Sequence, residues 1–285
     1  MSATQPVIQR LLTELRPPPA WSLIVSVYGD AVVPRGGALW LGTLLEIMAG
    51  FGVAGGGVRT SISRLASDGW LERTRIGRNS YYRLTKKGRT TFDAATERIY
   101  FAPPHVWDGR LRIAVVENGD ARGVLRAALE EIGFGALAPG VLIAPSGDEP
   151  TPDGAIVLQA AEVSEEAARR LAARAWPLTR IAGGYGRFVA TFGALRPAEL
   201  ARLGDLEALA LRILLIHEYR RIILRDPLLP TALLPAGWPS REARALCATL
   251  YRALVPASER WLDAHGLNES GPLPPPDQRF YQRFA

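Results

Sequence analysis

Cysteine and lysine are almost absent from the sequence. Its 285 residues include one cysteine, Cys247, and only two lysines, Lys86 and Lys87, so arginine carries nearly all of the positive charge. A single thiol excludes an internal disulfide framework and any zinc site built from several cysteines. Cys247 lies on the apolar side of a predicted helix over residues 241–255, and we expect it to pack in a core rather than to act as a nucleophile.

Long apolar segments are also missing. The longest candidate, around residues 209–216, ends at Glu218 and Arg220, well short of the roughly 18 residues that span a bilayer. The first 20 residues lack the basic and then apolar layout of a secretory signal peptide. A composition of 48% hydrophobic and 22% charged residues is typical of a globular chain. We therefore expect a cytoplasmic protein without a membrane partner.

The positive charge is concentrated in the first third of the chain. Residues 1–100 hold 13 basic and 7 acidic side chains, whereas the remaining 185 residues hold 21 of each. Between Arg59 and Arg89 there are nine basic residues and only two acidic ones, Asp68 and Glu72. A basic segment confined to one region indicates a polyanionic partner for that region. The alternative is an ordinary solvated face in an arginine-rich chain.

The same region shows the order of elements of a helix-turn-helix. Ser22 is placed to cap a helix over residues 23–32, a turn follows at 34–37, and apolar residues at helical spacing predict a second helix over 41–48. A glycine-rich break at 54–57 precedes a third helix from Val58. On this third helix Val58, Ile62 and Leu65 form the core stripe. The opposite face carries Arg59, Thr60, Ser63, Arg64 and Ser67. Arginines and short hydroxyls on an exposed helix are typical of a reader of the major groove.

A basic hairpin follows this helix. Residues 70–75 and 80–84 read as strands on either side of a turn at 76–79, which is the signal of a hairpin. A hairpin directly after a recognition helix is a wing, and a basic tip suits contacts to phosphates. We predict base contacts from Arg59, Thr60, Ser63 and Arg64. The predicted contacts to the DNA backbone and at the wing tip are Arg35, Arg73, Arg75, Arg78, Asn79, Lys86 and Lys87.

Three regions of the chain resemble the PaaX family of bacterial repressors of phenylacetate catabolism. The resemblance rests on residues 32–88, on Trp107-Asp108-Gly109 with Gly133-Phe134-Gly135 and Pro139-Gly140, and on residues 217–221 followed by Arg225-Asp226-Pro227-Leu228-Leu229-Pro230. It implies a repressor that phenylacetyl-coenzyme A releases from its operator, without catalysis, metal or cofactor. It also implies a middle domain similar in fold to the CRISPR-associated Cas2 proteins.

The middle region itself reads as a small α+β domain. Strands are predicted over 111–115, 141–144 and 155–158, with helices over 122–132 and from Ser164 to residue 175. This order favours a ferredoxin-like fold. The Cas2-like fold opens an alternative, a metal-dependent nuclease that uses the two acids after the first strand, Glu117 and Asp120. Fold likeness alone carries no activity, so we expect a non-enzyme.

The last 90 residues are predicted to be mostly helical. On a helix over 206–224, His217 and Arg220 fall on the apolar stripe, where polar groups are costly to bury unless they are paired. One explanation is a structural pair, to Asp226 or to a backbone carbonyl. The other is an effector site, in which arginines bind the phosphates of an acyl-coenzyme A. The residues assigned to that site are His217, Arg220, Arg221 and Arg225. Position 221 is not a second histidine, so the zinc-protease motif is excluded.

The sequence thus predicts an α+β protein of three domains. These are a winged helix-turn-helix over 1–100, a ferredoxin-like domain over 105–180 and a helical domain over 181–285 that carries dimerisation and effector binding. One short recognition helix offers few base contacts, so a homodimer on a palindromic operator in double-stranded DNA is expected. A third alternative is a DNA-binding protein without an effector. The operator sequence and the role of the proline-rich tail at 272–276 stay open.

Overall fold

The computed structural model describes residues 7–101, 106–117, 119, 122–147 and 150–285. It divides into two compact units. The first comprises Met1–Ala102, Gly186–Arg221 and Arg241–Ala285, and the second comprises Pro103–Tyr185 and Ile222–Ser240. The predicted helical domain over 181–285 is divided between the two units, and most of it lies in the same unit as the N-terminal third. The hydrophobic pattern reveals that these helices have a buried side, but not which element covers it.

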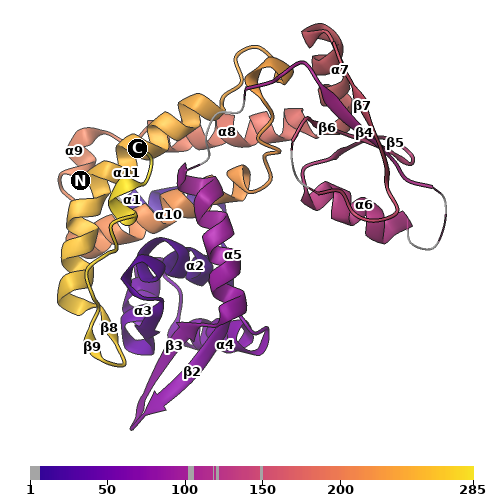
Figure 1. The fold of residues 1–285 in the computed structure, drawn as a ribbon. Helices are drawn as coiled ribbons and strands as arrows, with labels where there is room; N and C mark the ends of the chain where they lie inside the picture. Colours follow the sequence, from indigo (N-terminus) through magenta and orange to yellow (C-terminus); the bar gives the residue numbers. More distant parts are fainter. Residues whose placement is uncertain (1–6, 102–105, 118, 120–121, 148–149) are drawn as a thin grey trace. The chain divides into compact units, whose positions relative to one another are not determined.

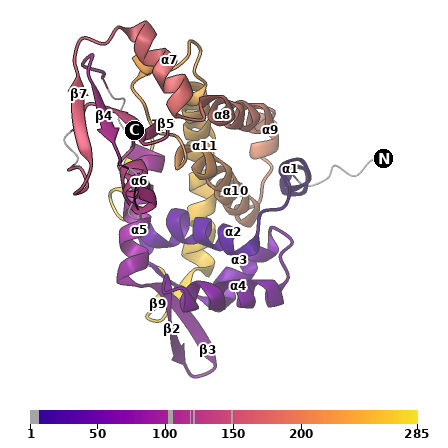
Figure 2. The same cartoon turned by 90° about the vertical axis from the view of Figure 1, so that its right-hand side faces the viewer.

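The N-terminal part of the first unit is built from five helices and a small sheet (Figures 1 and 2). Its elements are α1 (Val7–Leu15), α2 (Ala20–Val27), β1 (Ala38–Trp40), α3 (Leu41–Ala49), α4 (Gly55–Ser67), β2 (Leu71–Ile76), β3 (Asn79–Leu84) and α5 (Lys86–Thr96). The strands pair antiparallel in the order β1-β3-β2. The predicted order of helices and hairpin is therefore present.

Two local predictions in this part are wrong. Ser22 lies inside α2, whose N-cap is Pro19, so the chain turns into the helix earlier than the hydroxyl suggests. The glycines at 55–57 form the first turn of α4 rather than a break before it. Glycine is unfavourable inside a helix but tolerated where the helix is held by packing, and Val58 on the next turn is fully buried.

The C-terminal helices make up most of the rest of the first unit. The elements are α8 (Leu178–Gly193), α9 (Pro197–Leu200), α10 (Asp205–Ile223), α11 (Ser240–His265), β8 (Leu267–Asn268) and β9 (Gly271–Pro272), of which α8 begins in the second unit and continues in the first from Gly186. Every residue of α10 from Ala208 to His217 is buried, so this part of the helix is surrounded by other parts of the protein. In the described part of the chain no helix is both long and apolar enough to cross a membrane, although α11 spans 26 residues.

The second unit contains a four-stranded antiparallel sheet in the order β5-β6-β4-β7. Its elements are β4 (Leu111–Val115), α6 (Arg122–Glu131), β5 (Gly135–Ala138), β6 (Val141–Pro145), β7 (Ile156–Ala160) and α7 (Glu165–Ala175). Leu111 and Ile143 pack with the alanines of α7, whereas Ala114 and Leu142 pack with Leu129 of α6. The two helices therefore cover opposite faces of the sheet (Figure 1).

The elements of this unit follow the predicted order except for one strand. The helix that begins after Ser164 follows the last strand, as the sequence predicts, but β5 was not predicted. Gly135 of β5 has room only for a hydrogen, since an added Cβ would lie 2.4 Å from the ring of Trp176. A four-residue strand of glycine, alanine and leucine carries no alternating pattern, which explains why the sequence does not indicate it.

Candidate nucleic-acid interface

Helix α4 presents a polar face to solvent. Val58, Ile62 and Leu65 are buried, and the helix packs through them against α2 and α3. The residues predicted to read bases, together with Ser67, are all exposed: Arg59, Thr60, Ser63 and Arg64. The structure therefore places them on one accessible face, as their spacing predicts.

The exposed face of α4 offers both donors and acceptors. The Thr60 hydroxyl donates to the carbonyl of Gly56 at 3.1 Å, and the Ser67 hydroxyl donates to that of Ser63 at 3.1 Å, so their oxygens remain available as acceptors. The Arg64 side chain is 76% exposed, and its Nε lies 3.9 Å from Asp68 Oδ2, too far for a hydrogen bond. Arginine always carries its charge and can bond a guanine through two donors.

The hairpin β2–β3 extends outward from the helices beside α4 (Figures 1 and 2). Ile76 pairs with Asn79, which leaves a two-residue turn in which Gly77 adopts φ +59°, a conformation that favours glycine. Arg75 donates from Nε to the Gly77 carbonyl at 3.2 Å, and Arg78 is exposed at the tip. The turn therefore holds two guanidinium groups at the end of the hairpin.

Three further predicted cations lie near this hairpin. Arg73 donates from Nε and Nη2 to the Ser80 hydroxyl at 3.2 and 2.8 Å, which holds its guanidinium along the sheet. Lys86 and Lys87 are exposed in the first turn of α5, where the Thr85 hydroxyl accepts from the Gly88 amide at 3.0 Å. A helix N-terminus favours anions, so lysines there suit a phosphate.

Arg35 is not available to DNA. Its side chain is 1% exposed and donates from Nη2 to Glu259 at 2.5 Å and to Asp263 at 2.8 Å. Nη1 also donates to the Pro274 carbonyl at 3.0 Å, which gives the proline-rich tail a structural contact. The prediction of a backbone contact from Arg35 is therefore withdrawn: its charge is neutralised inside the unit by residues more than 220 positions away.

A buried network of charges, which the sequence does not reveal, surrounds Asp30. Its carboxylate accepts from Arg212 Nε at 2.7 Å and from the hydroxyls of Tyr100 and Tyr251 at 2.8 and 2.9 Å. Arg283 donates from Nη1 to the Asp30 carbonyl at 2.8 Å and to its Oδ1 at 3.1 Å. The network thus joins the N-terminal helices to α10, to α11 and to the C-terminal tail. The sequence does not reveal this network because its members lie far apart along the chain, and each of them alone resembles an ordinary polar residue.

His217 and Arg220 are engaged in a structural contact with α2. Ser26 Oγ lies 3.0 Å from Nδ1 of His217 and accepts from Arg220 Nε at 2.8 Å. Arg220 Nη2 also donates to the carbonyl and the hydroxyl of Ser22, at 2.9 and 3.0 Å. Burial lowers the pKa of Arg220 to about 10. These contacts favour the structural explanation. Of the two predicted kinds of partner the backbone carbonyl is present, that of Ser22, and the α2 serine hydroxyls take the place of Asp226.

The other two residues assigned to the effector are exposed. Arg221 donates from Nη1 to both carboxylate oxygens of Glu218, at 3.1 and 3.2 Å, and Arg225 lies at the surface of the second unit. Asp226 is buried and accepts from the Tyr185 hydroxyl at 2.7 Å. The four predicted effector residues therefore do not form one site within either unit.

The burial of His217 makes the stability of the first unit depend on pH. Burial, and next the positive charge of Arg220, lowers the pKa of His217 from 6.5 to about 3. Below pH 6.5 the imidazole binds a proton in the unfolded chain but stays neutral in the folded chain. The contribution of His217 to the free energy of unfolding is therefore complete above pH 6.5 and falls as the pH drops toward 3. We expect the free energy of unfolding to decrease by about 2 kcal/mol between pH 7.5 and pH 5 because of this group.

Urea unfolding of the wild-type protein and of His217→Gln at the two pH values measures this effect. The variant should be less sensitive to acid by about 2 kcal/mol, because it has no imidazole to protonate. The same pH dependence in both proteins would contradict a neutral, buried His217.

The residues weighed for catalysis give no support to an enzyme. Glu117 follows β4, whereas Asp120 lies outside the described residues. Within the described ranges no group of three histidine, cysteine, aspartate or glutamate residues is placed to hold a metal ion. Cys247 is fully buried, and burial raises the pKa of its thiol well above the usual value, as expected of a packing residue.

Comparisons with known proteins give the same picture. Residues 19–88 match the family described as PaaX-like protein, and residues 176–264 match the PaaX-like protein C-terminal domain. The chain is 36% identical over 282 residues to the transcriptional repressor PaaX of Escherichia coli (strain K12), with 93% of this chain and 89% of that protein covered. Its fold is similar to the uncharacterized protein Rv0674 from Mycobacterium tuberculosis, with a TM-score of 0.53 and 23% identity over 77% of this chain and 89% of that one.

The named relative is a regulator and not an enzyme. The motif-based assignment made from the sequence is confirmed by both family matches and by the extent of the identity. The chain belongs to the PaaX-like protein family.

Proposed function

We propose that this protein is a transcriptional repressor of the phenylacetate type, acting on double-stranded DNA in the cytoplasm. The first unit then contains a winged helix-turn-helix in which α4 is the recognition helix and β2–β3 is the wing. The observation that carries this proposal is the exposed basic face of α4 next to a hairpin with a basic tip. The identity to a transcriptional repressor over nearly the whole chain supports it.

The predicted contact residues take two roles in this proposal. Arg59, Thr60, Ser63 and Arg64 of α4 contact base edges, while the hairpin and the start of α5 bind phosphates. The phosphate-binding set is Arg73, Arg75, Arg78, Asn79, Lys86 and Lys87. A helix of 13 residues reads only a few base pairs, so the functional form is a homodimer on two half-sites.

The effector in this proposal is phenylacetyl-coenzyme A or a related aryl acyl-coenzyme A. It needs to bind the DNA-incompetent state better than the DNA-bound state. A difference of about 10- to 100-fold, which is roughly 1–3 kcal/mol, weakens operator binding by the same factor. Family resemblance supports this step.

Fluorescence anisotropy with a labelled fragment of the protein's own promoter tests the proposal. We expect specific binding over random DNA and release by phenylacetyl-coenzyme A but not by free phenylacetate. Specific binding that phenylacetyl-coenzyme A does not weaken would support a repressor but contradict this choice of effector. Equal affinity for promoter and random DNA would contradict a sequence-specific repressor and favour a general DNA-binding protein.

Substitution of the wing tip tests the role of the hairpin separately. Arg78→Ala should weaken binding to promoter and random DNA by a similar factor, because a phosphate contact carries no sequence information. The slope of log affinity against log salt concentration should fall by about 1 for each lost phosphate contact. Titrations at several salt concentrations measure it, and an unchanged slope would exclude Arg78 from the interface.

A further inference from the structure

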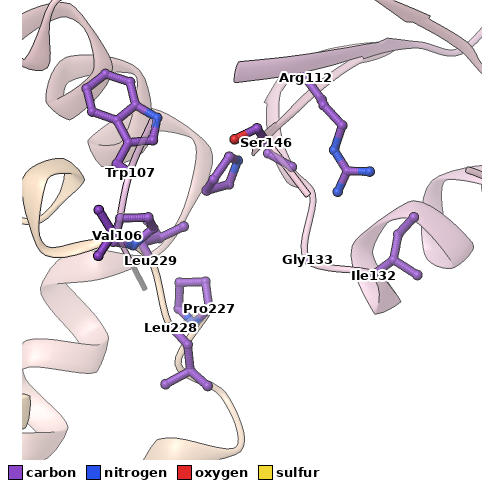
Figure 3. A pocket seen from close by; sticks show the side chains of 12 residues that line it. Val106, Trp107, Arg112, Ile132, Gly133, Ser146, Pro227, Leu228 and Leu229 are labelled. Carbon is purple, nitrogen blue, oxygen red and sulfur yellow. The ribbon is translucent and has the colours of Figure 1, made fainter. Parts of the chain in front are cut away.

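The second unit contains a pocket whose walls come from segments far apart in the sequence (Figure 3). Its volume is about 150 Å³. Four segments line it. They are Val106 and Trp107 with Arg112 of β4, Ile132 and Gly133 after α6, Ala144 and Pro145 at the end of β6 with the following Ser146, and Pro227, Leu228, Leu229 and Pro230. All of these residues lie within one unit.

The pocket is the meeting point of three motifs that the DNA interface does not use. These are the segments that begin at Trp107, at Gly133 and at Arg225, by which the sequence resembles its family. Phe134 packs in the core on the α6 side of the sheet, and Leu229 and Trp107 pack in the core on the α7 side. Trp107, Gly133 and residues 227–230 also line the pocket. Their convergence indicates a site and not three independent structural features.

One buried cation lies in this pocket. Arg112 is 6% exposed although it stands on the apolar α6 face of the sheet, beside Ala114 and opposite Ala144. Its guanidinium lies 5.0 Å from the ring of Phe134, and Figure 3 shows it directed from the strand toward the space beside Ile132. The Ser146 hydroxyl donates to Asp108 at 2.6 Å, so it faces the pocket as an acceptor only. An arginine side chain has five N–H donors, so Arg112 can donate to an oxygen of a ligand beside its other contacts.

The opposite wall is held in an unfavourable backbone conformation. Leu228 adopts φ +54°, the left-handed region that side chains other than glycine rarely occupy. The conformation is fixed because the Leu228 amide donates to Asp226 Oδ1 at 2.8 Å, while Tyr185 donates to Asp226 Oδ2 at 2.7 Å. Strained residues that the surrounding structure supports in this way occur preferentially at ligand sites.

We propose that this pocket binds the aryl-acyl group of a small molecule. The ring is enclosed by the proline and aliphatic side chains, and Arg112 donates to the carbonyl or carboxylate oxygen next to it. A cavity of about 150 Å³ holds one benzene ring, so the coenzyme A part of a thioester remains outside. This proposal rests on the proposed function, because it places the acyl end of the effector, and it replaces the site predicted at His217 and Arg220.

Isothermal titration calorimetry on the full chain tests the pocket without DNA. The probes are phenylacetyl-coenzyme A, phenylacetate and coenzyme A. We expect the thioester to bind, coenzyme A alone to bind at least 10-fold more weakly, and Arg112→Met to lower the affinity for the thioester at least 10-fold. The matched control is Arg126→Met, because Arg126 is exposed on α6 and pairs with Glu130. It should bind as the wild type does.

A second variant guards against loss of folding. If thermal unfolding shows that Arg112→Met is destabilised, Ile132→Phe fills the half-buried edge of the pocket and retains the arginine. This variant should also lower the affinity for the thioester at least 10-fold. Wild-type affinity in both variants, or equal affinity for coenzyme A and its thioester, would overturn the proposal. If the variants lose thioester binding but the thioester does not release the wild-type protein from its operator, the pocket is a binding site and the proposed control of DNA binding by the effector is wrong.

Discussion

Asp30→Asn is expected to lower the free energy of unfolding of the first unit by about 3–5 kcal/mol, the typical loss when one partner of a buried ion pair is removed. Asp30 and Arg212 have no exposed side-chain surface, and Arg283 is 3% exposed. Arginine cannot release its proton to escape burial. The asparagine keeps the shape of the side chain but leaves these guanidinium groups without the charge between them.

The charges of this network balance in the native protein. Three guanidinium groups, those of Arg35, Arg212 and Arg283, meet the three carboxylates of Asp30, Glu259 and Asp263. Loss of one carboxylate therefore leaves a net positive charge in a buried site. Urea unfolding at neutral pH measures the change as a lower midpoint with the same slope.

An exposed pair provides the matched control. Arg260 donates to Asp205 at 2.7 Å, the same distance as that between Arg212 and Asp30, but both partners are largely exposed. Asp205→Asn should change the stability little, because water screens such a pair. Equal effects of Asp30→Asn and Asp205→Asn would show that the network around Asp30 does not hold the unit together.

The double substitution Arg59→Ala and Arg64→Ala is expected to weaken operator binding by at least 100-fold. Each bidentate contact to a base contributes about 1–3 kcal/mol of discrimination, which is roughly 5- to 150-fold. Affinity for random DNA should fall much less, so the ratio of specific to random binding should collapse. Both side chains are exposed, and the fold should be unaffected.

The control for this double variant removes the same charge elsewhere. Arg126 and Arg170 are exposed arginines on α6 and α7 of the second unit, each next to a glutamate one turn away. Their replacement by alanine should leave the affinity for the promoter within about twofold of the wild type. A similar loss in both double variants would mean that net charge, and not the face of α4, determines binding.

Local patterns predicted the elements of the candidate interface well. The apolar spacing of Val58, Ile62 and Leu65 defines the buried side of α4, and the glycine turn sets the register of β2 and β3. Such signals lie within a few residues of one another, so the sequence displays them directly. Where a short segment lacks a pattern, as in β5, or where glycines begin a helix, as in α4, packing overrides local preference.

By itself the sequence determined the family, the α+β composition, and which residues of α4 and of the hairpin face solvent, because local periodicity encodes each of these. Only the tertiary structure decided the role of buried polar groups. It withdrew Arg35 from the interface and paired His217 and Arg220 with the serines of α2. It also gathered Trp107, Arg112 and Leu228 around one pocket. The physical reason is that a charge is stabilised by whichever group lies next to it in space, and along the chain that group lies tens to hundreds of residues away.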